Sequence, residues 1–292
     1  MKRFSLLLLF FCSSLALFAQ TNSSNGLSSN TLLWKITGKG IKESYLFGTF
    51  HLMCKDDIHF SSNLLRSLRK SDELCLEIKM DAGDLFAKSI EFLSMKNDST
   101  LKDVLSDNDY KKLSRYFTDS LQTPLFLLQK LKPMFLMAML YPKMLQCNNP
   151  TGVEERLMAS AKEYKKQIIG LETIEYQTAI FDSIPYKLQA SELIQTIDSL
   201  SNSKKEFQQM VNYYKAQRLD KLGEKSLKSE AITSKYEDIF LKNRNNNWIK
   251  KLPTLLKRKS LFIAIGAGHL PGQYGMINLL RQSGYTITPI NN

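Results

Sequence analysis

The sequence has few of the residues that bind metals or form cross-links. Its 292 residues include three histidines and four cysteines, and no two cysteines form a C-x-x-C pair. Zinc ribbons and dithiol redox centres use such pairs, so the sequence excludes both. The H-E-x-x-H, G-x-S-x-G and P-loop motifs are also absent. Their absence excludes the common zinc-protease, serine-hydrolase and phosphate-loop sites.

Long apolar runs are confined to the start of the chain. Phe4–Phe18 is almost wholly apolar, follows a basic pair and precedes the small residue Ala19. This pattern predicts a secretory signal peptide over residues 1–19. No later segment approaches the roughly 18 apolar residues of a membrane span. We therefore expect an exported protein that is periplasmic, cell-envelope or secreted. An uncleaved anchor, or a lipoprotein signal through Cys12, is the alternative.

Acidic side chains are in the minority. The formal charge is +12, from 40 Lys and Arg against 28 Asp and Glu. This balance favours acidic partners or anionic membrane surfaces, so a peripheral membrane contact is one partner that we consider. The lysines are scattered over helix-like stretches and form no concentrated arm. We therefore expect no nucleic-acid partner.

Removal of the leader leaves three cysteines, Cys54, Cys75 and Cys147. An odd number in an exported protein leaves at least one free thiol. We interpret all three as small buried apolar side chains. A Cys54–Cys75 bridge is an alternative that the sequence leaves open.

Strand-like segments lie at both ends of the chain, with helix-like segments between them. Leu32–Thr37 and Ser44–Phe47 flank a glycine loop, which predicts a hairpin. The other predicted strands are Leu74–Ile78, Gln167–Leu171, Ser260–Ile265 and Tyr285–Pro289, and a helix is predicted from about Gly272 to Ser283.

This order predicts an α/β fold. Its central mixed β-sheet is built from both chain ends, with a long helical block inserted between them and packed around it. After a flexible Ser/Asn-rich lead-in over residues 20–30, we expect a single domain over residues 31–292. The helical insertion is expected at about residues 82–257.

Two of the three histidines occupy the same local sequence. One strand runs into Gly48-Thr-Phe-His51-Leu, and another runs into Gly266-Ala-Gly-His269-Leu. A glycine at a strand end permits a tight turn without a Cβ clash. Each histidine is then presented at the carboxyl edge of the sheet, where α/β folds place their sites. His59 has no such frame, and we interpret it as non-catalytic.

Glu77 is the acidic partner that the strand pattern offers. In Glu73-Leu-Cys-Leu-Glu77 the two acids share one face of a strand. Glu73 lies at the strand start, where we expect it to be solvated, and Glu77 lies at the carboxyl end. Two neutral imidazoles and a carboxylate are a usual ligand set for a catalytic divalent metal. Glu77 is therefore either the third ligand beside His51 and His269, or the base that activates a metal-bound water.

The leader, the GTFHL and GAGHL motifs and the strand with Glu77 together resemble the TraB/GumN family, which includes the TIKI proteases. The IIGLET segment (Ile168–Thr173) and the Arg244-x-x-x-Trp248 helix extend the resemblance, which covers about Leu32 to Ile290. It implies a metal-dependent hydrolase that cuts peptide or small amide substrates with manganese or cobalt, with zinc as a further option. It also implies a mixed α/β fold related to erythromycin esterase and to the haem-binding ChaN-like proteins.

Carried over to this sequence, the resemblance makes His51 and His269 the motif histidines and Glu77 the acid. Gly48 and Gly266 match the turn glycines. Two other functions stay open: a haem- or ligand-binding protein of the ChaN-like fold with the histidines as axial ligands, and a non-catalytic scaffold with a vestigial site.

Arg244 is the main supporting residue. It shares a helical face with Trp248, one turn away. Arg244 either holds a substrate carboxylate, pairs with Glu77, or forms a structural ion pair beside a packed tryptophan.

Four further residues have a functional and a structural interpretation. Glu172 and Gln177 either orient a metal-binding histidine or cap the next helix. Glu154 either joins the site or is a first-turn acid favoured by the helix dipole. Tyr274 either donates to a developing oxyanion or packs as an ordinary aromatic residue.

Overall fold

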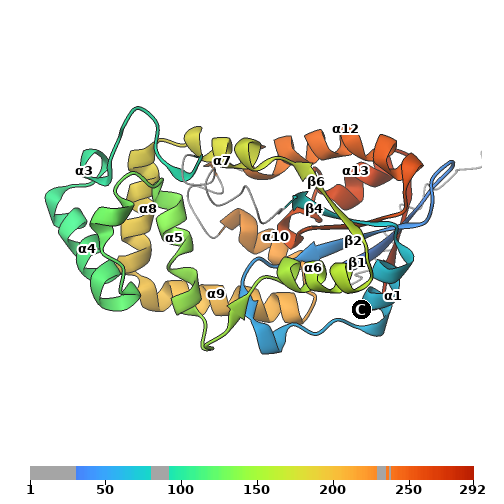
Figure 1. Cartoon of the computed structure of the whole chain (residues 1–292), viewed down its shortest axis with the longest axis horizontal. Coiled ribbons are helices and arrows are strands. Elements are labelled where there is room, and N and C mark those ends of the chain that lie inside the picture. Colours follow the sequence, from blue (N-terminus) through green and yellow to red (C-terminus); the bar gives the residue numbers. More distant parts are fainter. Residues whose placement is uncertain (1–30, 80–91, 229–234, 237) are drawn as a thin grey trace, which may run out of the picture.

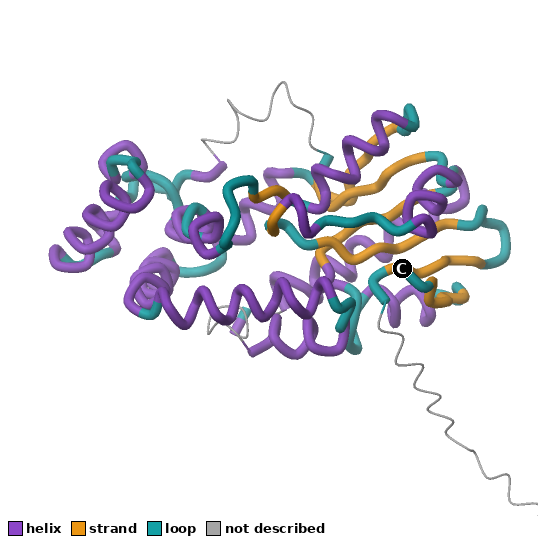
Figure 2. The backbone as a smooth tube through the Cα atoms, turned by 90° about the horizontal axis from the view of Figure 1, so that it is seen from below, coloured by secondary structure: helices purple, strands orange, loops and turns teal. Residues whose placement is uncertain are grey.

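The computed structural model describes residues 31–79, 92–228, 235–236 and 238–292. The predicted leader and lead-in therefore lie outside the described residues. The described chain forms a lobe built on a β-sheet and a lobe built of helices (Figures 1 and 2). Each lobe has its own cluster of buried apolar side chains. The central sheet and the inserted helical block that the sequence predicts are both present.

The main sheet has six strands in the order β6-β4-β7-β2-β1-β8. Their bounds are β1 Leu33–Thr37, β2 Ser44–Thr49, β4 Glu73–Ile78, β6 Gln167–Glu172, β7 Leu261–Gly266 and β8 Thr286–Ile290. The first four in that order are parallel to one another, while β1 is antiparallel to both β2 and β8. The sheet is mixed and uses both ends of the chain, as predicted.

The strand β7 lies at the centre of the sheet between β4 and β2. All six of its residues are buried. Its sequence, LFIAIG, has no polar face because helices cover the sheet on both sides. The helices α1 (Ser62–Lys70) and α6 (Val153–Glu163) lie on one face, and α12 (Asn243–Arg258) and α13 (Met276–Gln282) lie on the other (Figure 1).

The helical lobe is built from the middle of the chain. Its helices and the helices that lead back to the sheet are α3 (Leu101–Val104), α4 (Asp107–Leu121), α5 (Pro133–Ala138), α7 (Ile174–Asp182), α8 (Tyr186–Asp198), α9 (Leu200–Lys215) and α10 (Leu219–Lys228). Prolines break this region into short pieces, since Pro133 begins α5 and Pro124 precedes a short 3-10 turn. Among the described helices, none has both the length and the apolar character needed to cross a bilayer.

Three local predictions need correction. The last helix begins at Met276 and not near Gly272, because Pro271 and Gly272 make a turn in which Gly272 has φ +88°. Glu73 is buried and not solvated, because β4 is an inner strand flanked by β6 and β7. Gly48 lies within β2 in an extended conformation, so it serves close packing and not a turn. A Cβ there would lie 3.1 Å from the Cβ of Ala267.

The cysteine interpretation was wrong for two of the three residues. Cys54 and Cys147 form a disulfide, and Cys75 is the free thiol. The alternative Cys54–Cys75 bridge is therefore excluded. Cys75 is buried inside β4, and burial raises the pKa of its thiol to about 12. It is the small apolar side chain that we expected at this position.

Candidate functional site

The carboxyl ends of the parallel strands bring the predicted residues to one edge of the sheet. Glu77 is the penultimate residue of β4, and Glu172 is the last residue of β6. His51 follows β2 by two residues, and His269 follows β7 by three. This edge is where open α/β sheets bind their ligands, because the loops there diverge from the sheet.

The three central groups meet at Gly266. A Cβ on this glycine would lie 3.2 Å from Oε1 of Glu77, 3.4 Å from Nε2 of His51 and 3.7 Å from Cδ2 of His269. Both imidazoles and the carboxylate therefore border the same small space, which any larger residue would fill. Gly266 is therefore needed because it has no side chain to fill this space. Its φ is −50°, so the backbone there is not left-handed and does not itself require a glycine.

Glu77 is held as an ionised carboxylate. Its Oε1 accepts a hydrogen bond from the backbone N–H of Gly266 (2.7 Å). Its Oε2 accepts from Nη2 of Arg244 (2.5 Å) and from Nε2 of Gln177 (3.2 Å). Burial opposes ionisation, but His269, Arg244, His51 and the Gly266 N–H outweigh it and lower the pKa of Glu77 to about 2. An ionised carboxylate here suits either a metal ligand or a base.

Arg244 is the cation at the centre of the cluster. Only 7% of its surface is exposed, and besides Glu77 it donates to the carboxylate of Glu172, where Nε lies 3.0 Å from Oε1. Its Nη1 lies 3.1 Å from Nε2 of His269. Trp248 packs 4.8 Å from the guanidinium and donates its Nε1 to Glu172 (3.0 Å). Two of the three alternatives for Arg244 are thus present together, the pairing with Glu77 and an ion pair, here with Glu172, beside a packed tryptophan.

His269 is buried and has a defined tautomer. Its Nδ1 lies 2.7 Å from Oδ1 of Asn245, whose Nδ2 donates to the backbone oxygens of His269 and Tyr274. With Oδ1 as the acceptor, Nδ1 of His269 carries the proton and Nε2 carries the lone pair. Burial above all lowers the pKa of His269 to about 3, so the ring is neutral.

Asn245 was missed by the sequence analysis. It is buried one turn before Trp248, on the face of α12 that also carries Leu252 and Leu256. A polar residue on an otherwise apolar helical face is the signal that would have identified it.

His51 is paired with Glu154. The Nδ1 of His51 lies 2.7 Å from Oε1 of Glu154, which also accepts from the hydroxyl of Thr49 (2.6 Å). Although 72% of the His51 side chain is exposed, this edge of the ring lies against a largely buried carboxylate. Desolvation lowers the pKa of His51, but the charge and hydrogen bond of Glu154 outweigh it and raise the pKa to about 9. Glu154 is both a first-turn residue of α6 and a member of the site.

The donor set fits a divalent cation in type, orientation and charge. Glu154 and Asn245 occupy the Nδ1 atoms of His51 and His269, so Nε2 is the atom that each ring would offer to a metal. The network contains three carboxylates, from Glu77, Glu154 and Glu172, against one guanidinium. Once His51 gives up its Nε2 proton to bind a metal, the network carries two excess negative charges. Buried charge of this kind requires a counter-ion, and a divalent cation supplies it.

One contact must be exchanged for that cation to bind, because Arg244 now donates to Nε2 of His269. Across the described residues, no three His, Cys, Asp or Glu side chains form a ready-made metal centre. His51, Glu77 and His269 are the residues that would hold the ion.

The remaining candidates lie around the cluster. Gln177 contacts Glu77, and neither it nor Glu172 hydrogen-bonds a histidine ring. The ring of Tyr274 packs against the Lys242 amine, 4.6 Å away. His59 lies elsewhere, in a separate pocket with Phe60 and Lys215.

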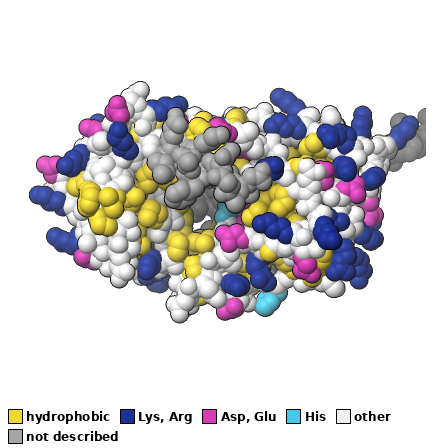
Figure 3. Space-filling view, in the orientation of Figure 1, with side chains coloured by type: hydrophobic (Ala, Val, Ile, Leu, Met, Phe, Trp, Pro, Cys, Tyr) yellow, Lys and Arg dark blue, Asp and Glu magenta, His cyan; other side chains and the backbone are white. Residues whose placement is uncertain are grey.

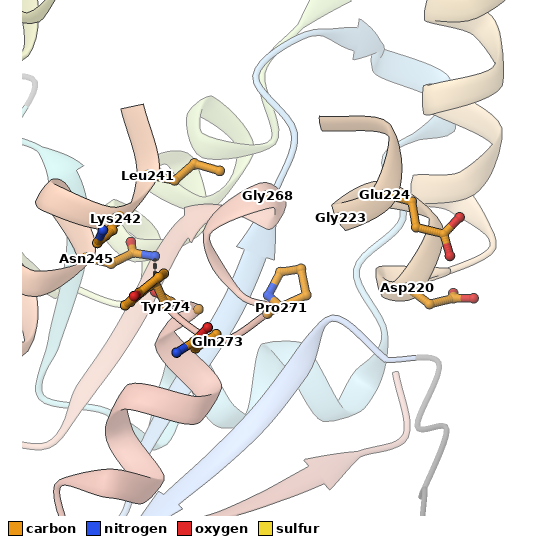
Figure 4. Close-up of a pocket in the computed structure, with 12 residues that line it drawn as sticks. Asp220, Gly223, Glu224, Leu241, Lys242, Asn245, Gly268, Pro271, Gln273 and Tyr274 are labelled. Carbon is orange, nitrogen blue, oxygen red and sulfur yellow. Dashed lines mark hydrogen bonds between the residues drawn. The ribbon is translucent and has the colours of Figure 1, made fainter. Parts of the chain in front are cut away.

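A pocket of about 390 Å³ adjoins His269. Gly268 and Asn245 border it on the side of the site, and Asp220 and Glu224 of α10 border it on the other (Figure 4). Because Asn245 faces both this pocket and His269, a ligand in the pocket would lie beside the site.

Comparisons with known proteins identify the family of the chain. The profile of the TraB/PrgY/gumN family matches residues 32–289, a range that includes every residue of the site. The uncharacterized proteins YbaP of Escherichia coli (strain K12) and of Shigella flexneri are each 25% identical over 263 residues, covering 87% of this chain and 95% of their own. No solved structure matches the chain. The chain therefore belongs to the TraB/PrgY/gumN family.

Proposed function

We propose that this protein is an exported metal-dependent hydrolase that acts on peptide or small amide substrates. The observation that carries the proposal is the convergence of His51, His269 and Glu77 on the space beside Gly266. The two Gly-x-x-His motifs lie far apart in the sequence, yet they lie at the ends of two adjacent parallel strands. In both rings Nδ1 is hydrogen-bonded, so Nε2 is the nitrogen that would bind a metal.

The excess negative charge of the network supports a divalent ion as the cofactor, and manganese, cobalt or zinc would suit this ligand set. Such an ion supplies Lewis acidity and a bound water of lowered pKa. His51 and His269 would bind it through Nε2, and Glu77 through its carboxylate.

The chain's own groups provide the remaining chemistry. The guanidinium of Arg244 faces the same space and would stabilise negative charge that develops on the substrate oxygen. Glu172 and Trp248 fix the plane of that guanidinium, and Glu154 fixes the ring of His51. These contacts hold the charged groups in place before the substrate binds.

Metal analysis of the purified protein tests the proposal. We expect about one divalent ion per chain in wild type and a marked loss in both His51→Ala and His269→Ala. His59→Ala is the matched control and should retain the wild-type amount. Equal metal content in all four proteins would remove the site assignment. A preparation with a Soret band would instead support the haem-binding alternative.

A second measurement tests the activity. The metal-loaded protein should cleave members of a mixed peptide or acyl-amide library, and the two histidine variants should not. A fully loaded wild-type protein that cleaves nothing would favour the non-catalytic scaffold.

A further inference from the structure

The disulfide lies directly beside the His51–Glu154 pair. Cys54 follows His51 by three residues, and Cys147 precedes Glu154 by seven. The two cysteines are 93 residues apart in sequence, so the bond joins two segments that the chain itself does not connect closely.

Backbone contacts continue from the disulfide to the site. Cys54 and Met53 form the strand β3, which pairs with β5 (Pro150–Thr151). The N–H of Lys55 donates to the oxygen of Asn149 (3.1 Å), next to the disulfide. The N–H of Val153 donates to the oxygen of Phe50 (3.1 Å), next to the His51–Glu154 pair. The two segments are therefore closed together from residue 50 to residue 55.

Gly152 shows how close this approach is. A Cβ at this position would lie 2.8 Å from the backbone oxygen of His51 and 3.1 Å from Oε2 of Glu154. Only a glycine fits between the backbone of one member of the pair and the side chain of the other.

The ring of His51 has little other support. Most of its side chain is exposed, whereas His269 is buried against Trp248 with ring centres 4.6 Å apart. The orientation of His51 therefore depends on the hydrogen bond from Nδ1 to Glu154. That hydrogen bond forms only while the two backbone segments stay together.

From these contacts we infer that the Cys54–Cys147 disulfide is a positioning element of the site, which holds Nδ1 of His51 against Glu154 and so directs Nε2 towards the space beside Gly266. The inference deepens the proposed function, because the histidine concerned is one of the proposed metal ligands. It makes completion of the site dependent on thiol oxidation. The step is an exchange with the disulfide of an oxidant protein: the Sγ–Sγ bond forms between Cys54 and Cys147, and the oxidant's disulfide is reduced to two thiols.

Nitrogen-15 NMR of the imidazoles tests the inference without metal or substrate. The chain has three histidines, so each ring gives a resolvable pair of nitrogen signals. In wild type we expect His51 to give one set of signals, with its Nδ1 proton hydrogen-bonded to Glu154. In Cys54→Ser/Cys147→Ser, or in wild type reduced by a dithiol, we expect the Nδ1–H signal of His51 to be lost to exchange between forms. The signals of His269 and His59 are internal controls and should not move.

A substitution that separates the two segments but leaves the disulfide intact provides a second test. Gly152→Ala should disturb the His51 signals in the same way, because its methyl group separates the two segments. Both sets of variants should weaken binding of Zn²⁺ or Co²⁺ by about 10–100-fold, the usual effect of losing a group that orients a ligand.

The outcomes separate the two proposals. Unchanged His51 signals in folded, disulfide-free protein would overturn the positioning role, whatever the metal content of wild type. If the reduced protein unfolds, Gly152→Ala decides, and wild-type His51 signals in that variant overturn the inference. A wild type that binds no metal but shows the expected His51 changes would overturn the proposed function alone.

Discussion

Three of the roughly four hydrogen-bonding positions of the Glu77 carboxylate are engaged, which leaves one on Oε1 for a metal. Because Gly266 donates to one oxygen and Arg244 and Gln177 to the other, an amide at this position would face donors with its own N–H₂ group. We expect Glu77→Gln to lose bound metal by at least tenfold as well as turnover. Metal titration by calorimetry, beside a peptide-cleavage assay, measures both. A Gln variant that keeps its metal and loses only turnover would instead make Glu77 the base.

Arg244 has the largest expected effect on stability of any residue in the cluster. Replacing it with methionine leaves Glu77 and Glu172 buried without their counter-ion. Breaking a buried ion pair in this way costs about 3–5 kcal/mol of unfolding free energy. Urea unfolding of Arg244→Met measures the loss. The matched control is Arg258→Met, an exposed arginine of the same helix, for which we expect a change within about 0.5 kcal/mol. Equal stability of the two variants would contradict the central role of Arg244.

At the scale of elements, the pattern of apolar residues and the glycine and charged residues between them were sufficient to predict the strands of the main sheet. All six predicted strands exist within a residue or two, because apolar runs between glycine and charged segments define buried strands well. The same pattern placed Glu77 at the carboxyl end of β4, level with the histidine motifs, and the hydrogen bond to Gly266 confirms that level.

Contacts between elements were beyond such patterns. The pairs His51–Glu154 and His269–Asn245 join segments with no shared periodicity, so their members were assigned separately or missed. The Cys54–Cys147 disulfide was not predicted for the same reason. Cys147 lies in an irregular segment, whose position neither a strand pattern nor a helix pattern predicts.

The helical lobe depends on a buried lysine at the start of α5. Lys132 is 2% exposed, and its amine contacts Asp182 at the end of α7 (2.9 Å) and the backbone oxygens of Phe92 and Thr178. Burial raises the pKa of Asp182, but Lys132, Tyr186 and Lys96 outweigh it and lower the pKa overall.

A lowered pKa gives this pair a defined pH dependence. Its stabilisation is complete above the unfolded pKa of about 3.9 and is lost as pH falls through the lower folded value. Asp182→Asn should remove this acid-sensitive part and cost about 1–3 kcal/mol at pH 7, because the Lys132 charge loses its partner. Urea unfolding between pH 7 and pH 3 measures both. Asp198→Asn, which breaks the exposed pair with Lys112, should have little effect. A full acid response in Asp182→Asn would contradict the assignment.

At the scale of the molecule, the strands at the end of the chain complete the sheet that the first strands begin. Because β7 pairs with both β4 and β2, a chain ending at Lys259 loses the centre of its sheet as well as His269. We expect this truncation to abolish cooperative melting, measured by near-ultraviolet circular dichroism and calorimetry. A chain that lacks only Asn291 and Asn292 keeps every strand and should melt cooperatively. A sharp transition in the shorter chain would show that the sheet does not need β7.

Charge is distributed over the whole molecule without a dominant patch on the face that Figure 3 shows. Lys and Arg side chains are spread across both lobes, with acidic side chains among them. The sequence predicted this scatter from the positions of the lysines. A divalent ion at the site would therefore be attracted by the local carboxylates and not by the overall charge, which is positive.

The pairing of Leu33 with Ile290 in β1 and β8 also determines when the protein can fold. Contacts between residues so distant in sequence give a high contact order, and such topologies fold slowly because the closure of long loops precedes the gain from pairing. During synthesis, the strands that carry His51 and Glu77 have no β7 to pair with until the ribosome has released almost the entire chain. The sheet can therefore close only at the end of translation, so a chain exported as we propose would cross the membrane before its sheet is complete.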